Sequence, residues 1–344
     1  MTPPVTDTDV LVVGGGPVGL ATAIEARLAG REVVVVEPRT GPVDKACGEG
    51  LMPGTLRALQ RLGVDPAGWD LRGISYRTVG GRHVDHAFRT GAGRGVRRTS
   101  LHAALGARAD ALGVTRVTGR VTTVEQDAEA VTAAGVRARW LLAADGLHST
   151  VRRLVGLERP TPTRRRRFGL RRHVPLAPWT DLVEVHWAPG AEAYVTPVGP
   201  DLVGVAVLGP PHTDWDAAVA ALPRLAERLG GLRPVGPTLG AGPLRQLTTA
   251  RTRGRVALVG DASGYVDALT GEGLRVGLAQ ARAAVATLGD AGAYERAWRA
   301  VTRDYRLLTT GLVTWAASPA RGAIVPVARR APWLYGAVVE RLAH

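Results

Sequence analysis

Three glycines near the start of the chain have the spacing that a bound dinucleotide requires. Gly14, Gly16 and Gly19 follow a short apolar run, and Glu37 ends a second apolar run. In this pattern the first glycine allows a tight turn after a strand, and the second lets the backbone approach a pyrophosphate. The third glycine lets helix and strand pack closely. A carboxylate 18 residues after the last glycine suits the hydroxyls of an adenosine ribose. The segment therefore predicts a site for an ADP moiety.

The elements around these glycines are two strands, over residues 10–13 and 33–36, and a helix of small residues between them. The helix would begin at Pro17 and Val18, so that its free N–H groups and positive end face the pyrophosphate. A glycine-rich turn without a ligand is the alternative. The complete strand–helix–strand unit, with the acid in place, favours the ligand.

Two later motifs narrow the choice of ligand. One reads Ala-Asp-Gly-Leu-His-Ser over residues 144–149. The other runs from Val-Gly-Asp-Ala-Ser-Gly over 259–264 to Thr-Gly-Glu-Gly over 270–273. With the opening glycines they resemble the flavoprotein monooxygenase family related to aromatic-ring hydroxylases. The resemblance is closer still to its geranylgeranyl-reductase-like branch, through Ala-Cys-Gly-Glu-Gly at 46–50 and the last motif, and it spans residues 9–288. It implies FAD as the cofactor.

The glycine pattern and the resemblance together predict an FAD site. Its expected residues are Gly14, Gly16, Pro17, Val18, Gly19, Glu37, Pro38, Arg39, Cys47, Gly48, Arg98, Val121, Asp145, Gly146, Gly260, Asp261, Gly271, Glu272, Gly273 and Leu274. By resemblance, Asp261 would accept a ribityl hydroxyl; a purely structural helix cap is the alternative. The helix that begins near Leu274 would point its N-terminus at the flavin N1–C2=O edge, where it stabilises negative charge.

Other expected contacts keep an alternative open. Asp145 and Gly146 would turn close to the pyrophosphate, or only end a strand. Arg98, preferred over its neighbour Arg97, would reach the FAD phosphates or ribose, because a guanidinium suits phosphate geometry. By resemblance, backbone groups of Val121 would contact the adenine. Arg39 could stack on the adenine or lie exposed.

No side chain is assigned a catalytic role, because the flavin carries the chemistry. The candidates for lining the reacting region are Cys47, Glu49 and Tyr265. For Cys47 a pocket-lining role is favoured over that of a small buried hydrophobe. The sequence has no Cys-x-x-Cys pair, which excludes disulfide-exchanging flavoenzymes. Its histidines show no metal-binding spacing, so no metal is expected.

The resemblance favours an NAD(P)H-dependent monooxygenase. NAD(P)H would reduce FAD transiently, O2 would form a flavin C4a-hydroperoxide, and a hydrophobic or aromatic small molecule would be hydroxylated. That substrate would lie in an apolar pocket drawing on Trp187, Tyr194, Val195 and Tyr265. The alternative is a geranylgeranyl-reductase-like ene reductase that reduces a C=C bond of an isoprenoid or similar substrate. A flavin halogenase is disfavoured, because the Trp-x-Trp-x-Ile-Pro motif is missing and the only lysine is Lys45.

The net charge of +14 invites a nucleic-acid or membrane interpretation. Lys45 is the only lysine among the 44 basic residues, which indicates a coding bias toward arginine. Solvated arginines are therefore favoured over nucleic-acid binding, including in the run over residues 164–167. For the tail over 305–343, helix packing is favoured over lipid contact. The single cysteine, the absence of an N-terminal signal pattern and the lack of a long apolar run predict a cytoplasmic protein without a transmembrane segment.

The order of strand-like and helix-like segments predicts an α/β fold. We expect a Rossmann-type FAD-binding domain that is interrupted by a mostly antiparallel β-sheet substrate domain and followed by a helical C-terminal tail. The FAD-binding parts are expected over 1–70, 97–163 and 251–290, a hairpin insertion over 71–96, the sheet domain over 164–250 and the C-terminal helices over 291–344. Ligands favour the cleft between two such bodies.

Overall fold

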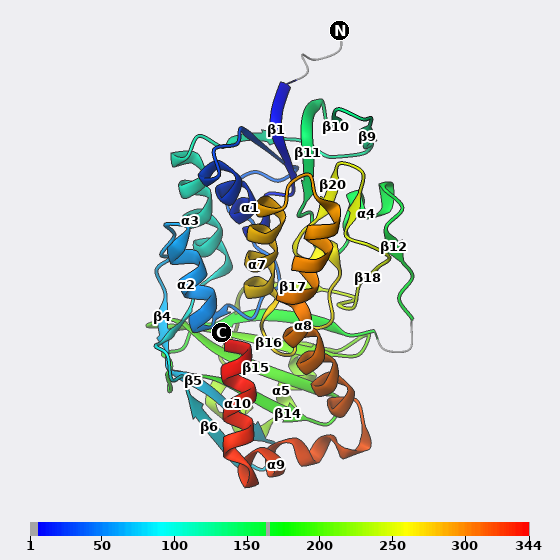
Figure 1. The fold of residues 1–344 in the computed structure, drawn as a ribbon. Coiled ribbons are helices and arrows are strands. Elements are labelled where there is room, and N and C mark those ends of the chain that lie inside the picture. The colour runs from blue at the N-terminus through cyan, green and yellow to red at the C-terminus, as the bar shows by residue number, and fades with distance from the viewer. Residues whose placement is uncertain (1–5, 163–165, 344) are drawn as a thin grey trace.

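The computed structural model describes residues 6–162 and 166–343 (Figure 1). Its first body is built on a mostly parallel sheet with the strand order β19-β20-β11-β1-β2-β8, which β10 and β9 extend from β11. The strands are β1 (Thr6–Val13), β2 (Val33–Glu37), β8 (Thr115–Thr118), β9 (Glu125–Gln126), β10 (Val131–Ala133), β11 (Val136–Ala143), β19 (Thr252–Arg253) and β20 (Val256–Leu258). Strand β1 pairs in parallel with both β2 and β11, so the glycine turn leaves from the centre of the sheet.

Both faces of this sheet are buried. Successive side chains of a strand point to opposite faces, and β1 is apolar on both. Val10 and Val12 pack into one hydrophobic cluster, whereas Leu11 and Val13 pack into another. The first cluster includes residues of five helices, of which α7 stands beside α8 in front of the sheet in Figure 1. The helices of this body are α1 (Pro17–Leu28), α2 (Pro53–Arg61), α3 (Arg98–Ala111), α4 (Thr150–Leu154), the 3-10 turn η2 (Gly260–Ser263), α7 (Gly273–Ala286) and α8 (Ala291–Ala316).

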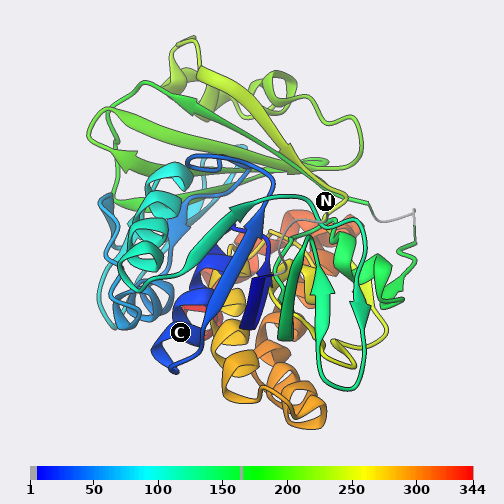
Figure 2. The same ribbon diagram turned by 90° about the horizontal axis from the view of Figure 1, so that it is seen from above.

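A second sheet has the order β17-β13-β16-β15-β14-β5-β6 and is antiparallel except where β14 pairs with β5. Figure 2 shows it as a separate layer, with the short helices α5 and α6 on its outer side. These elements are β5 (Gly73–Thr78), β6 (His83–Ala87), β13 (Phe168–Val174), β14 (Leu182–Ala188), β15 (Ala191–Gly199), β16 (Leu202–Gly209), α5 (Trp215–Ala220), α6 (Pro223–Leu229) and β17 (Val235–Ala241). The outer face is sealed by these helices, so the inner face is left to build a cavity.

Smaller elements complete the molecule. They are the sheet of β3 (Gly50–Leu51), β7 (Gly93–Gly95) and β4 (Trp69–Leu71), the pair β12 (Glu158–Arg159) and β18 (Leu247–Thr248), and the C-terminal η3 (Pro319–Ala323), α9 (Ile324–Arg330) and α10 (Pro332–Ala343). Helix α10 packs along β5 and β6 of the second sheet through Tyr335 and Val339. Among the described residues, no helix is long and apolar enough to cross a membrane.

The predicted fold class is confirmed: a Rossmann-like parallel sheet, a largely antiparallel sheet and C-terminal helices are all present. Within it, residues 214–229 form two helices, because Pro223 starts a new one and cannot continue the previous ladder of hydrogen bonds. The hairpin over 73–87 adds two strands to the second sheet.

The predicted domain boundaries stay a prediction. Arg164 and Arg165, half of the predicted arginine run, lie outside the described residues.

Arg152 ties three segments of the first body together. It is 1% exposed, and its guanidinium donates to the carbonyl oxygens of Leu147 and Ala262 at 3.0 and 3.2 Å. It also donates to Oε1 of Gln246 at 2.9 Å. Removing a buried cation would therefore leave several acceptors without a donor.

We expect Arg152→Met to lower the free energy of unfolding by about 3–5 kcal/mol, because the buried acceptors lose their charged partner. The neighbouring Arg153 is exposed, so Arg153→Met is the matched control and should change stability by less than about 0.5 kcal/mol. Urea unfolding of both variants measures the difference. Equal stability of the two variants would show that Arg152 is not a structural tie.

Candidate active site

A cavity of about 570 Å³ is lined by both sheets, by the loops that leave the parallel sheet and by α10. It extends from the glycine turn after β1 to three residues of the C-terminal helix, Val338, Val339 and Leu342. Most of the residues predicted for the FAD site line it. They are Gly14, Gly16, Pro17, Val18, Glu37, Pro38, Arg39, Cys47, Gly48, Arg98, Val121, Asp145, Gly146, Gly260, Asp261, Gly271, Gly273 and Leu274, together with Glu49 and Tyr265.

The glycine turn has no room for side chains on its packed side. Gly14 has a φ of 101°, and a Cβ built on Gly19 would lie 1.8 Å from the carbonyl oxygen of Gly14. On the open side, a Cβ on Gly16 would meet nothing nearer than Arg98 Nη2, at 4.0 Å. Gly16 caps α1 without a side-chain hydrogen bond, and Pro17 occupies the first turn. The free N–H groups of α1 therefore begin at the cavity wall, where an anion can accept from them.

Glu37 lies beside this turn as a carboxylate. Its Oε2 accepts from Gly15 N–H at 2.8 Å, and its Oε1 accepts from Arg39 Nε at 2.6 Å. Burial alone would raise the pKa of Glu37, but the hydrogen bonds from Arg39 and Gly15 lower it overall. In this structure Arg39 therefore pairs with the acid; stacking on an adenine stays a prediction.

The side chains of three charged residues in the cavity form no hydrogen bond or ion pair with a described residue. Arg98 Nε is buried without a hydrogen bond, and none is formed by Lys45 Nζ or by the Asp261 carboxylate. Burial raises the pKa of Asp261, against the opposing effect of Lys45 and Arg98. Burial likewise lowers the pKa of Lys45, although Asp261 opposes it. Such groups are costly unless a ligand satisfies them. Two cations and an acid beside a glycine turn match the phosphates and hydroxyls of FAD.

A buried network holds the loop over residues 46–50 against the second sheet. Glu49 has a φ of 61° and is 3% exposed. Its Oε1 accepts from Arg98 N–H at 2.9 Å, and its Oε2 lies 2.7 Å from His173 Nε2. Thr196 Oγ1 donates to Gly48 O at 2.8 Å. Sequence patterns did not point to His173 or Thr196, because each lies on a strand more than a hundred residues after the loop.

Two residues of the predicted list do not line the cavity. Gly19 packs on Gly14, as the glycine pattern requires. Glu272 is 1% exposed and pairs with Arg275, one turn into α7, so its side chain points into the protein. Asp145 lines the cavity and also holds the start of α4, because its carboxylate accepts from Val151 N–H at 3.0 Å and from the hydroxyl of Ser149, the N-cap residue of that helix. The structure thus supports a structural role for Asp145 beside the predicted one.

The predicted substrate pocket is partly wrong in its lining. Tyr194 and Tyr265 line the cavity, but Val195 and Trp187 do not. Val195 follows Tyr194 in β15 and therefore faces the outer layer of α5 and α6. Trp187 does not line the cavity; its ring packs edge-on against Tyr76, with the ring centroids 5.4 Å apart.

The sequence also missed Lys45 and the wall formed by α10. Lys45 directly precedes the motif over residues 46–50, and this position could have indicated that it lies near the cofactor. No motif near α10 in the sequence indicates that this helix lines the cavity.

A parallel sheet with a glycine turn that opens on unpaired charges defines a dinucleotide-binding protein. Comparison with known proteins makes this specific: residues 7–293 match the family described as FAD binding domain, and the chain belongs to this family. It is an FAD-dependent oxidoreductase.

The chain is 31% identical over 338 residues to menaquinone reductase of Mycolicibacterium smegmatis, covering 87% of this chain and 81% of that protein. It is 28% identical over 333 residues to digeranylgeranylglycerophospholipid reductase 1 of Methanothermobacter thermautotrophicus, covering 86% and 83%. The structure of p-nitrophenol 4-monooxygenase from Pseudomonas putida superposes with a TM-score of 0.79 at 22% identity, covering 97% of this chain and 99% of that one. This last likeness establishes the fold.

We expect Arg98→Met to weaken FAD binding by about 10- to 100-fold, because a charge-assisted hydrogen bond contributes about 1.5–3 kcal/mol. Arg97 is exposed and does not line the cavity, so Arg97→Met is the matched control and should bind normally. Titration of flavin-free protein with FAD, followed by flavin fluorescence, measures both. Equal affinities would remove Arg98 from the site.

Glu272 predicts a pH-dependent stability. Burial raises its pKa to about 7 despite Arg275, from an ordinary value of 4.5. The folded state then binds the proton more tightly than the unfolded state, so stability falls as pH rises between these two values. Relative to wild type, Glu272→Gln should gain roughly 1–3 kcal/mol between about pH 4.5 and 8.

The ion pair with Arg275 exists only while Glu272 is ionised, so its effect is already contained in the raised pKa. Exposed Glu227→Gln is the control for this measurement, made as unfolding free energies across the pH series. A variant whose difference from wild type stays constant with pH would show that Glu272 is ionised throughout.

Proposed function

We propose that this chain is an FAD-dependent reductase that adds hydrogen across a carbon–carbon double bond of an isoprenoid-bearing lipid. One observation carries the proposal: the cavity changes character along its length. The end near the glycine turn is charged. The end walled by β5, β14 and α10 is apolar, with Leu51, Met52, Ile74, Tyr76, Val183, Val185, Val338, Val339 and Leu342. Tyr76 is the one titratable residue in that lining set, and burial raises its pKa, which keeps it neutral. An uncharged chain fits this end.

The relatives that match over most of their length support a reductase. The names of both, a menaquinone reductase and a digeranylgeranylglycerophospholipid reductase, describe reduction of a lipophilic molecule. Sequence patterns favoured hydroxylation, with reduction of a C=C bond as the alternative; we now favour reduction.

FAD, when bound and reduced, supplies the hydride for such a reaction, and NAD(P)H is the proposed source of its electrons. The protein's part is to position the lipid, exclude water and provide a proton for the second carbon. Tyr265 is suited to hold that proton. Burial raises its pKa well above the ordinary value, so its hydroxyl stays protonated. It also lies beside the start of α7, since a Cβ on Gly273 would be 3.2 Å from its hydroxyl oxygen.

Hydroxylation by an NAD(P)H- and O2-dependent monooxygenase is the second candidate. A para-nitrophenol 4-monooxygenase of Pseudomonas is 34% identical over 179 residues, and this partial match supports it. Both reactions need the same FAD site, so the fate of the reduced flavin separates them.

The deciding experiment mixes reduced, oxygen-free protein with a prenyl lipid. We expect the flavin to be reoxidised without O2 while the lipid gains two hydrogens, as followed by absorbance and mass spectrometry. Reoxidation that requires O2, with oxygen incorporated into the substrate, would instead establish the monooxygenase.

The apolar end supplies a variant for the same assay. Val338→Phe should narrow the cavity and lower kcat/KM for a long prenyl chain about tenfold or more relative to a short one, since overpacking costs about 1–3 kcal/mol. Ala337 is the exposed neighbour on α10, so Ala337→Phe is the matched control. Equal chain-length preference in both variants would show that the lipid does not use this end.

A further inference from the structure

We propose that the junction of α9 and α10 docks on an anionic lipid bilayer, and that one apolar row of α10 leads the lipid chain from there to the cavity. The junction exposes apolar side chains that the described residues leave largely uncovered. Trp333 is 72% exposed, Leu334 44% and Val327 37%. An aromatic ring with a polar N–H suits the membrane–water boundary, where one end is wet and the other apolar.

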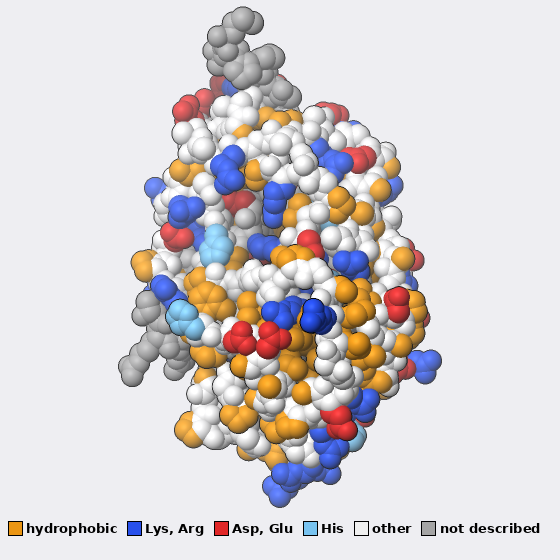
Figure 3. All heavy atoms as spheres, turned by 180° about the vertical axis from the view of Figure 1, so that it is seen from behind, with side chains coloured by type: hydrophobic (Ala, Val, Ile, Leu, Met, Phe, Trp, Pro, Cys, Tyr) orange, Lys and Arg blue, Asp and Glu red, His pale blue; other side chains and the backbone are white. Residues whose placement is uncertain are grey.

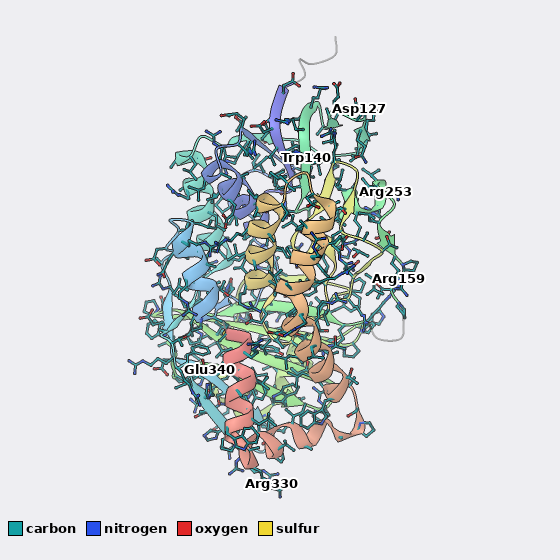
Figure 4. All side chains as sticks on the ribbon, viewed as in Figure 1. Asp127, Trp140, Arg159, Arg253, Arg330 and Glu340 are labelled. Atoms are coloured by element: carbon teal, nitrogen blue, oxygen red, sulfur yellow. The ribbon has the colours of Figure 1, made fainter. Side chains whose placement is uncertain are left out.

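The charged residues around this apolar surface indicate which partner it binds. Arg329 and Arg330 end α9 beside these residues, are exposed, and form no ion pair with a described residue. Figure 4 places Arg330 at the lower end of the molecule, and Figure 3 shows basic side chains gathered at that end. Residues 305–343 contain five arginines and a single acid, Glu340, which lies 2.7 Å from His86 Nε2. Arginines around an exposed apolar cluster match an anionic lipid surface.

Helix α10 connects this surface to the cavity. Leu334, Val338 and Leu342 recur at intervals of four residues and therefore form one row along the helix. The first is exposed at the surface, and the other two line the cavity. With a rise of about 1.5 Å per residue, the row is about 12 Å long. An apolar chain moving along it would stay in contact with apolar side chains.

A bilayer fits this surface better than a second copy of the chain does. In a symmetric dimer the same patch meets itself, so the Arg329–Arg330 pairs of two copies would approach each other and repel. The surface inference rests on the proposed function only for its purpose, which is delivery of a lipophilic substrate. Binding to vesicles is therefore measured without substrate, so that the two proposals fail separately.

The test is sedimentation of the FAD-loaded protein with phosphatidylcholine vesicles, with and without phosphatidylglycerol, at low and high salt. We expect binding that requires phosphatidylglycerol and weakens with salt. Arg329→Gln/Arg330→Gln should weaken it roughly 10- to 30-fold, and Trp333→Ser about tenfold. The controls are Leu28→Ser, a leucine 50% exposed on α1, and Arg159→Gln/Arg253→Gln, which Figure 4 places away from Arg330. Both should bind as wild type does.

Three results would overturn the proposal: no vesicle binding, equal binding by all variants, or self-association that Trp333→Ser abolishes. The last would assign the surface to a second copy. A further experiment compares substrate forms. The Trp333→Ser variant should reduce a detergent-dispersed prenyl lipid at the wild-type rate, but a vesicle-embedded prenyl lipid more slowly than wild type does. A slower rate in detergent as well would show that the residue acts on the site rather than on docking. Absence of reduction by the wild-type protein would refute the proposed function and leave the vesicle result standing.

Discussion

The cavity depends on one buried carboxylate. Glu49 takes a left-handed backbone conformation that a non-glycine residue rarely adopts, and its two oxygens contact different bodies. One accepts the N–H of Arg98 at the start of α3, and the other meets His173 on the second sheet. Arg171 also lies 3.9 Å from Glu49 and pairs with Asp44. The strained turn and the buried charges persist because each stabilises the other. Together with the hydrogen bond from Thr196 to Gly48, this joint fixes the loop that carries Cys47 between the sheets.

The sequence predicted the first body well because its signals are local. The turn at Gly14, the packing at Gly19 and the acid at Glu37 all follow from spacing within about forty residues. The later motif around Asp261 could also be placed, because parallel strands bring their carboxyl ends to one edge of the sheet. Whether these side chains bind FAD as predicted is a question for the affinity measurements.

Contacts between residues that are distant in the sequence could not be predicted from it. Val195 and Tyr194 are adjacent and apolar, and only the register of β15 determines which of them faces the cavity. The partner of Glu49 is 124 residues away. Leu342 lines the cavity because α10 packs against the strands over 73–87. No sequence motif predicts this packing. Local periodicity finds a helix but does not tell which distant surface its face will meet.

The structure also shows a role for the abundant arginines that composition alone does not reveal. Arg152, Arg167 and Arg171 are largely buried and connect segments that are distant in sequence, as Arg167 does by pairing with Glu192 and lying 3.6 Å from Asp267. A guanidinium suits this role because it donates in several directions and stays charged when buried. The positive charge is therefore used in two ways. Inside, it fastens the two bodies around the cavity. At the α9–α10 junction, where carboxylate partners are missing among the described residues, the same residue type is left free to meet an external anion. The same abundance of arginine can thus serve both the internal ion pairs and an external surface. Whether a carboxylate lies nearby determines which of the two roles an arginine takes.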